Sequence, residues 1–338
     1  MWGMSLSKNL AIDFGNNNTL LTDQSSILLS QPSFMVINEV NNKIEAVGDK
    51  AYAMMEKTHS HLKPIKPLKG GVISDGESAK TLLKELVDSV DKPSLLGRKY
   101  NYLLSGIPYD TTQVEKRALR DALDQFSAKN TFLVHEPLAA ALGMNLNIQE
   151  PEGKLIVDIG GGITEVVVIS LSGIAAFRSL RIAGDALDEE IQDYFRREYN
   201  MSIGLKTAEA VKKKIGCVFS PVATNETVMV KGKDLMEGIP VSRPISQQEL
   251  TKVLERPFKQ IEECILQSLE VCPPELSSDI YQSGIFVTGG NAQLKGVKER
   301  FYKIFKLQVN IDPQSLLSVS KGIGQILSSP TKYKSILL

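Results

Sequence analysis

The sequence predicts an α/β protein made of two similar halves. Strand and helix patterns alternate along the 338 residues, which is typical of an α/β fold. One sequence motif occurs twice, about 145 residues apart. It consists of an apolar strand that ends in Asp-x-Gly, followed by a turn and a second strand. At roughly 150 residues per domain, the length also favours two domains. No low-complexity tract or long linker separates the halves, so we expect them to pack directly against each other.

In the first half, short apolar runs between turn residues predict strands, and apolar residues at helical spacing predict helices. A strand over Lys8–Leu21 is interrupted by a Gly/Asn turn. The other expected strands are 33–37, 44–47, 102–107 and 132–134. The expected helices are 76–90, 111–126 and one that has Pro137 in its first turn.

In the second half the pattern restarts at Leu155. Strands are expected over 155–159, 165–171 and 174–180. A further apolar strand over Ile285–Thr288 ends in a Gly-Gly turn and leads to a helix from Leu294 onward. The stretch 247–269 predicts one long amphipathic helix without chemistry, and the three lysines at 212–214 predict a solvated helix face.

The composition is that of a globular protein, with 42% apolar and 23% charged residues. Lys plus Arg and Asp plus Glu both number 39, so the formal net charge is zero and no basic field attracts DNA or RNA. Nucleic acid is therefore not an expected partner. Three scattered cysteines are too few for a disulfide framework or a zinc site, which favours a reducing cytoplasm: Cys217, Cys264 and Cys272.

The two repeated turns are candidate phosphate-binding loops. Glycine and asparagine permit positive φ, which turns successive backbone N–H groups toward one point. An Asp beside such a loop suits a hydrated Mg²⁺ ion. The alternative is two hairpins with hydrophilic tips, and the symmetric duplication favours the phosphate site. The residues are Asp13, Gly15, Asn16, Asn17, Asn18 and Thr19 in the first turn and Asp158, Gly160, Gly161, Gly162, Ile163 and Thr164 in the second.

A third element completes a candidate nucleotide site. The strand 285–288 runs into Gly289, Gly290, Asn291 and Ala292. Glycines let the backbone approach a flat ligand closely, and the start of the following helix offers free N–H groups. Alone, this turn is weak evidence for a ligand site.

The three elements, in this order and spacing, resemble the actin, hexokinase and heat-shock-chaperone ATPase superfamily. The stretches 132–141, 182–185 and 273–280 are similar to the MreB family of bacterial actins, and the resemblance covers residues 8–328. It implies an actin-like ATPase fold, with two duplicated ribonuclease H-like lobes, each carrying a smaller subdomain, around a central nucleotide cleft. The expected divisions are 1–34, 70–145 and 315–338 for the first core, 35–69 for its subdomain, 146–183 and 246–314 for the second core, and 184–245 for its subdomain.

The resemblance also implies site residues for ATP and Mg²⁺. Asp13 and Asp158 would hold the metal through water, and Gly289 to Ala292 would lie under the adenosine. Glu209 and Lys212 match the helix that brackets the ribose and base, although Ala210 stands where the family has an arginine. The alternative for Glu209 and Lys212 is a solvated pair three residues apart on a helix.

The implied catalytic residues are Glu136, Asp158 and Thr164. Glu136 matches the carboxylate that orients the attacking water, and the alternative is an acidic residue that only favours a helix N-terminus. Two positions depart from the family pattern, because Ile163 and Asn16 each stand where the family has threonine. Since Ile163 cannot bind water, we expect ATP binding with slow hydrolysis.

The resemblance further implies filaments, with the chain itself as partner. They would lie in the cytoplasm, peripheral on the inner face of the cell membrane, and organise cell-wall synthesis and cell shape with membrane proteins of cell-wall elongation. Leu95 and Leu96, at a Pro/Gly loop tip flanked by Lys92, Arg98 and Lys99, are the candidate contact with inner-membrane lipid. The alternative is a loop that folds back over both leucines.

No window of the sequence reaches the roughly 18 or more apolar residues that a membrane span requires. The first seven residues lack the basic start of a secretory signal. The segment with Trp2 is interpreted as a loosely ordered tail, with contact to a bilayer interface as the alternative. Two other functions stay open at this point. One is an actin-like filament that positions a plasmid or organelle. The other is a soluble small-molecule kinase, for which no sugar-binding segment with a catalytic carboxylate is found.

Overall fold

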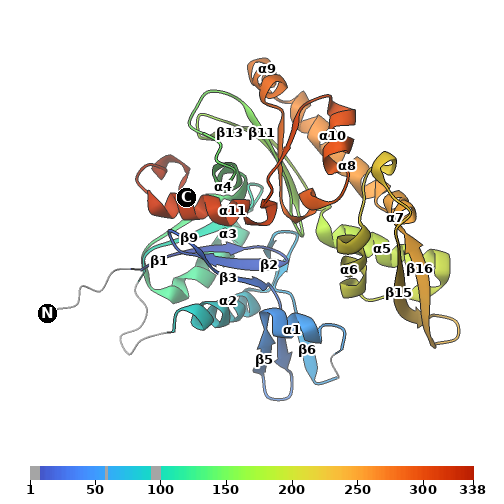
Figure 1. Ribbon diagram of the computed structural model, residues 1–338. Helices are drawn as coiled ribbons and strands as arrows, with labels where there is room; N and C mark the ends of the chain where they lie inside the picture. Colours follow the sequence, from blue (N-terminus) through green and yellow to red (C-terminus); the bar gives the residue numbers. More distant parts are fainter. Residues whose placement is uncertain (1–7, 58–59, 93–99) are drawn as a thin grey trace. The chain divides into compact units, whose positions relative to one another are not determined.

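The computed structural model describes residues 8–57, 60–92 and 100–338 and divides into two compact units (Figure 1). The first unit comprises residues 1–150 and 317–338, and the second comprises 151–316. Each unit contains one five-stranded sheet. The finer division of each half into a core and a small subdomain stays a prediction.

The two five-stranded sheets have the same topology. In each, a central strand pairs antiparallel with the next strand of the chain and parallel with a strand from much later in the sequence. The prediction of a duplicated α/β architecture is therefore confirmed. The first sheet, in the order β10-β9-β1-β2-β3, contains β1 (Lys8–Phe14), β2 (Asn18–Thr22), β3 (Ile27–Pro32), β9 (Tyr100–Ile107) and β10 (Ala128–His135). The second, in the order β13-β12-β11-β17-β18, contains β11 (Lys154–Ile159), β12 (Thr164–Ser170), β13 (Gly173–Leu180), β17 (Ile285–Thr288) and β18 (Val309–Ile311).

Helices cover both faces of the first sheet. Leu10, Ile12 and Phe14 of β1 share one core with the buried leucines of α2. Because side chains alternate along a strand, Asp13 points to the opposite face, where α11 contacts β1. The helices of this unit are α1 (Gly48–Met54), α2 (Gly76–Val90), α3 (Gln113–Leu123), α4 (Glu136–Gly143) and α11 (Ser318–Ser328).

Helices α4 and α11 cross at backbone contact, and Figure 1 shows them side by side. A Cβ added at Gly143 of α4 would lie 1.8 Å from the Ser318 carbonyl oxygen of α11. A Cβ added at Gly322 of α11 would lie 1.7 Å from the Ala139 carbonyl oxygen of α4. Neither position tolerates a side chain at this separation, so the two glycines fix where α11 lies against α4.

The second unit has one large apolar core between its sheet and its helices, with Phe195, Phe258 and Phe301 fully buried. Its helices are α5 (Gly184–Tyr199), α6 (Leu205–Ile215), α7 (Gln247–Val253), α8 (Glu255–Glu270), α9 (Pro274–Ser283) and α10 (Val297–Phe305). The single long helix expected over 247–269 is wrong, because it breaks at Leu254. Pro257 lacks the N–H that would bond to the Val253 carbonyl, and its ring crowds that carbonyl, so α7 ends there and α8 begins.

Three small sheets complete the fold of the described residues, and most expected elements are present with shifted ends. Strand β3 was not expected, and the helix expected from Leu294 begins at Val297, after a 3₁₀ turn over Gly290–Gln293. Within the described residues, none of the helices combines the length and apolar character that crossing a bilayer requires. The small sheets contain β4 (Met35–Asn38), β5 (Lys43–Val47) and β6 (Leu62–Ile65); β7 (Leu68–Lys69) and β8 (Val72–Ile73); and β14 (Met201–Ser202), β15 (Thr227–Asp234) and β16 (Pro240–Ser246).

Candidate nucleotide site

The first candidate phosphate loop is the β1–β2 hairpin. Phe14 pairs with Thr19 across it, which leaves a loop of residues 15–18. A Cβ added at Gly15 would lie 2.7 Å from the Asn18 carbonyl oxygen, so only glycine fits there. The Thr19 hydroxyl is buried and lies 2.8 Å from the Ser33 hydroxyl, which in turn donates to the Gly15 carbonyl at 2.6 Å. Strand β3 and its end thus brace the loop.

The β11–β12 hairpin of the second unit repeats this geometry. Ile159 pairs with Thr164, leaving a loop of equal length over residues 160–163. A Cβ added at Gly160 would lie 3.0 Å from the Ile163 carbonyl oxygen, a crowded contact that is less severe than the 2.7 Å at Gly15 of the first hairpin. Asp158 is half-buried at the position of Asp13. The predicted duplication therefore extends from the sheets to the details of the turn.

One expectation about these loops is wrong. None of the residues 15–18 or 160–163 has a positive φ, although glycine and asparagine permit it. Four-residue hairpin loops are most often built around a type I turn, whose φ angles are negative. The first glycine of each loop instead allows close backbone approach, most tightly at Gly15.

Asp13 is a buried carboxylate that suits a hard cation. It is 8% exposed, and its Oδ2 accepts a hydrogen bond from the Ser320 hydroxyl of α11 at 3.0 Å. Burial raises the pKa of Asp13 to about 6, and the Ser320 bond opposes the rise. In the described part of the chain, neither Lys nor Arg pairs with Asp13. Its oxygens are the donor type that Mg²⁺ prefers.

The loop asparagines of the first hairpin have different surroundings. Asn16 is buried, and its side-chain oxygen accepts a hydrogen bond from the Gly71 backbone N–H at 3.3 Å. Its Nδ2 donates to the Asn17 side-chain oxygen at 3.3 Å. Asn17 and Asn18 are half-buried. The side chain of Asn16 is thus occupied in holding the loop to the residues between β7 and β8.

The Gly-Gly turn after β17 packs directly on the second hairpin. Gly289 has a φ of +84°, and a Cβ there would lie 2.4 Å from both Asp158 Oδ1 and the Ile159 carbonyl oxygen. The Asn291 side-chain amide donates to the Gly160 carbonyl at 2.6 Å. Asn291 and Ala292 are buried. The structure therefore brings Asp158, Gly160 and the turn at 289–292 together, as the sequence predicts for parts of one site.

Lys212 belongs to the same cluster. Its Nζ donates to the Gly184 carbonyl at 2.8 Å and to Asp188 Oδ2 at 2.9 Å. Gly184 N–H in turn donates to the Gly160 carbonyl at 3.1 Å, so Lys212 is linked to the second hairpin through the start of α5. Burial raises the pKa of Asp188, and the Lys212 ammonium opposes that rise.

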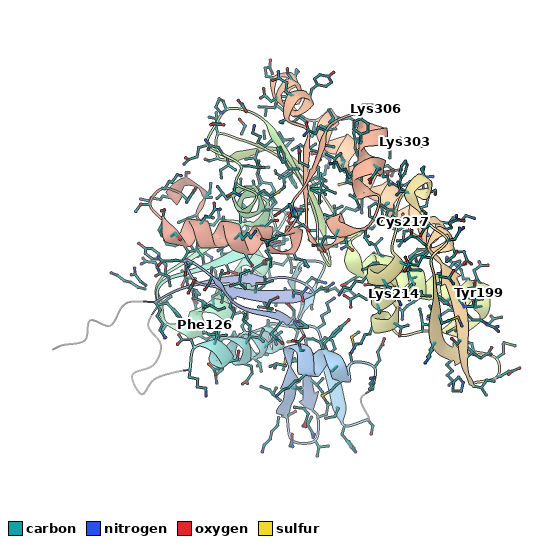
Figure 2. The ribbon with its side chains drawn as sticks, viewed as in Figure 1. Phe126, Tyr199, Lys214, Cys217, Lys303 and Lys306 are labelled. Carbon is teal, nitrogen blue, oxygen red and sulfur yellow. The ribbon has the colours of Figure 1, made fainter. Side chains whose placement is uncertain are left out.

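The solvated face expected over 212–214 is wrong at Lys212 and confirmed at Lys213 and Lys214, and the alternative of a solvated pair between Glu209 and Lys212 is wrong. Lys212 is only 5% exposed, so it lies on the buried face of α6, whereas Lys213 and Lys214 are exposed; Figure 2 labels Lys214. Glu209 forms its ion pair with Lys213 at 2.7 Å, one helical turn on, and not with Lys212. Within that pair Glu209 is half-buried, whereas Lys213 is exposed.

Glu136 and Thr164, both expected to be catalytic, lie in different units. Glu136 begins α4, and its side chain lies over the end of β9, where a Cβ added at Gly106 would be 3.1 Å from its Cγ. With Phe14 and Gly106 it lines a cavity of about 20 Å³, room for about one water molecule. Thr164 is fully buried, and its hydroxyl donates to the Ile182 carbonyl at 2.7 Å. This bond gives Thr164 a structural role, and the catalytic roles stay predictions.

The described residues contain no group of three or more His, Cys, Asp or Glu side chains that could hold a metal ion by themselves. Mg²⁺ commonly binds through one or two carboxylates, water and the phosphates of its substrate. Single carboxylates at Asp13 and Asp158 fit that mode. Leu95 and Leu96, the expected lipid contacts, lie outside the described residues, as does Trp2.

Comparison with known proteins identifies the family. Residues 7–335 match the model of the family described as "MreB/Mbl protein". The chain belongs to the MreB/Mbl family. The cell shape-determining protein Mbl of Bacillus subtilis (strain 168) is 34% identical over 327 residues, covering 96% of this chain and 97% of that protein. The cell shape-determining protein MreB of Escherichia coli (strain K12) is 36% identical over 326 residues, covering 95% and 93%.

A solved structure of the family gives the same fold. The crystal structure of MreB5 of Spiroplasma citri bound to AMPPNP matches with a TM-score of 0.92 and 34% identity, covering 98% of this chain and 99% of that one. The expected actin-like ATPase fold of this MreB/Mbl-family chain is therefore confirmed.

Two features of the candidate site were not predicted from the sequence. Ser320, which bonds to Asp13, lies 307 residues further along the chain and belongs to no motif. Asp188, which pairs with Lys212, is 24 residues from it. The nearest sequence signal is the pair Gly322 and Gly324 in a helical pattern, which indicates close packing of α11 but not its partner.

Proposed function

We propose that this chain binds ATP with Mg²⁺ and polymerises into membrane-associated filaments that organise cell-wall synthesis and cell shape. One observation supports nucleotide binding most strongly: two hairpins share strand pairing, loop length, a glycine whose added Cβ would crowd a carbonyl oxygen of the loop, and an aspartate at the same position. MreB5, a relative of the same fold, binds the ATP analogue AMPPNP.

The proposed roles of the residues are those that the family resemblance implies. Asp13 and Asp158 hold Mg²⁺ through water, and the metal neutralises phosphate charge. The loop residues contact the phosphates: Gly15, Asn16, Asn17, Asn18 and Thr19 in the first hairpin, and Gly160, Gly161 and Gly162 in the second. Glu209, Lys212 and the turn from Gly289 to Ala292 contact the nucleoside.

Hydrolysis is proposed to be slow. Glu136 lines a cavity with room for about one water molecule, which suits a carboxylate that orients an attacking water. Ile163 has no hydroxyl with which to hold that water in the second loop. The chain would therefore be a weak ATPase whose turnover accompanies filament dynamics.

The partners are proposed from family membership. The relatives are named cell shape-determining proteins, which favours a filament of this chain acting with membrane proteins of cell-wall elongation. A filament that positions a plasmid or organelle is the second candidate, and the names of the relatives do not favour it. A soluble small-molecule kinase has no support from the family. Leu95 and Leu96 are the proposed lipid contacts.

Sedimentation of the whole chain tests this proposal. With Mg²⁺ and ATP the chain should pellet at high speed, and it should stay in the supernatant without nucleotide. Phosphate release in the same samples should be slow and should rise in Ile163→Thr. Absence of ATP-dependent pelleting would contradict the filament.

The membrane contact is tested by flotation with liposomes that contain anionic lipid. The double variant Leu95→Ser/Leu96→Ser should still pellet with ATP but should no longer float with the liposomes, because it loses the apolar contact. Val40→Ser is the matched control, since Val40 is a 73% exposed apolar side chain at another loop. Equal flotation of the double variant and the unchanged chain would defeat the membrane assignment.

A further inference from the structure

The buried hydrogen bond between Ser320 and Asp13 joins the last long helix to the first hairpin. The Ser320 hydroxyl donates to Asp13 Oδ2 at 3.0 Å, and the two residues are 0% and 8% exposed. Within the described residues it is the one side-chain hydrogen bond to Asp13. A bond to a charged acceptor in a dry environment is stronger than a neutral surface bond.

The position of Ser320 is imposed by the packing of α11. Ser318 and Gly322 both contact the backbone of α4. The Ser318 carbonyl lies against Gly143, and Gly322 lies against the Ala139 carbonyl. Ser320 lies two residues from both Ser318 and Gly322. At about 100° per residue it therefore faces away from α4 and toward β1. The helix cannot turn this hydroxyl away from Asp13 without breaking the crossing.

The bond leaves the two carboxylate oxygens of Asp13 with different surroundings. Oδ2 is held by α11, whereas Oδ1 is on the side of the loop, where a Cβ added at Gly15 would lie 3.9 Å from it. The last torsion of an aspartate side chain is soft, so a hydrogen bond on one oxygen decides which oxygen faces the loop.

We propose that Ser320 is a positioning residue, which orients the Asp13 carboxylate so that Oδ1 faces the loop and the hydrated magnesium ion of a bound nucleotide. The inference rests on the proposed ATP and Mg²⁺ site. It concerns the first hairpin alone. In the second hairpin the backbone of Gly289 packs against Asp158 Oδ1, so close backbone packing holds that carboxylate from one side.

Two variants of equal shape separate the hydroxyl from the packing. Ser320→Thr keeps the hydroxyl and Ser320→Val removes it, while both add similar volume to the buried site. The affinity for N-methylanthraniloyl-ATP is measured with Mg²⁺ and with EDTA, and the ratio of the two affinities is the readout. We expect the affinity with Mg²⁺, divided by the affinity with EDTA, to be roughly tenfold smaller in the valine variant than in the threonine variant. The two variants should bind equally well in EDTA.

The other outcomes are decisive as well. An unchanged ratio in Ser320→Val would overturn the inference, and so would an equal loss with Mg²⁺ and with EDTA, which indicates a structural role only. If the larger side chains prevent folding, as judged by circular dichroism, Ser320→Ala is compared by the same criterion with Ser328→Ala. The Ser328 hydroxyl lies on the same helix but bonds to Gln24 and Gly324 backbone oxygens. If the unchanged chain binds no nucleotide, the proposed function fails, and the inference with it.

Discussion

At the scale of single residues, the burial of Asp13 has a consequence for stability. Its carboxyl group ionises near pH 3.8 in the unfolded chain and near pH 6 in the folded chain, because burial disfavours the charge. Between these values the unfolded state releases its proton first. The free energy of unfolding should therefore fall as the pH rises from about 4 to about 6.

Asp13→Asn removes this titration and keeps an acceptor for the Ser320 hydroxyl. Without nucleotide or Mg²⁺, the stability of the variant relative to the unchanged chain should grow by on the order of 3 kcal/mol between pH 4 and pH 7. Urea unfolding at several pH values measures this difference. A difference that does not change with pH would show that Asp13 does not titrate with a raised pKa.

Residue types predicted the loops but not the partners of their side chains. Asp13, Gly15 and Gly160 were found from the pattern alone, because a glycine after a strand and an aspartate is a local signal. The ion pair between Lys212 and Asp188 could not be found this way, since a run of three lysines is typical of a solvated face. Whether the first of them is buried depends on how α6 packs against α5, which is tertiary information.

At the scale of elements, the crossing of α4 and α11 positions the first half of the candidate site. Alternation along β1 predicts that Asp13 points to the face opposite Leu10 and Phe14. The sequence does not predict which helix covers Asp13. Expected strand and helix ends differ from the structure by a few residues. The break at Leu254 is predictable from Pro257, because a proline removes a helical hydrogen bond even where the apolar pattern continues.

Gly322→Ala tests the crossing. The added Cβ would lie 1.7 Å from a carbonyl oxygen of α4, so the helices must separate, and we expect a loss of at least about 2 kcal/mol in the free energy of unfolding. Gly324→Ala is the matched control on the same helix. Its Cβ would lie 3.5 Å from the Asp23 carbonyl oxygen, an ordinary contact, and alanine favours helix by up to about 1 kcal/mol. Equal stability of the two variants in thermal or urea unfolding would refute a tight crossing.

At the scale of the whole molecule, the duplication explains why the fold was predictable. Two copies of one hairpin at a fixed offset indicate two similar sheets, and both sheets have the same strand order and the same parallel and antiparallel pairs. Local sequence patterns predict neither the filament that this chain would form nor the membrane on which it would lie. Those functions are therefore proposals that rest on family membership.

The central claim is that the two aspartate-bearing hairpins bind ATP with Mg²⁺. Titration calorimetry of ATP into the unchanged chain, Asp13→Asn and Asp158→Asn, with and without Mg²⁺, tests it most directly. We expect one ATP per unchanged chain, and each variant should bind roughly tenfold or more weakly with Mg²⁺ present and nearly as well as the unchanged chain without it. No uptake by the unchanged chain at millimolar ATP, or variants that bind Mg²⁺ and ATP as tightly as the unchanged chain, would contradict the claim.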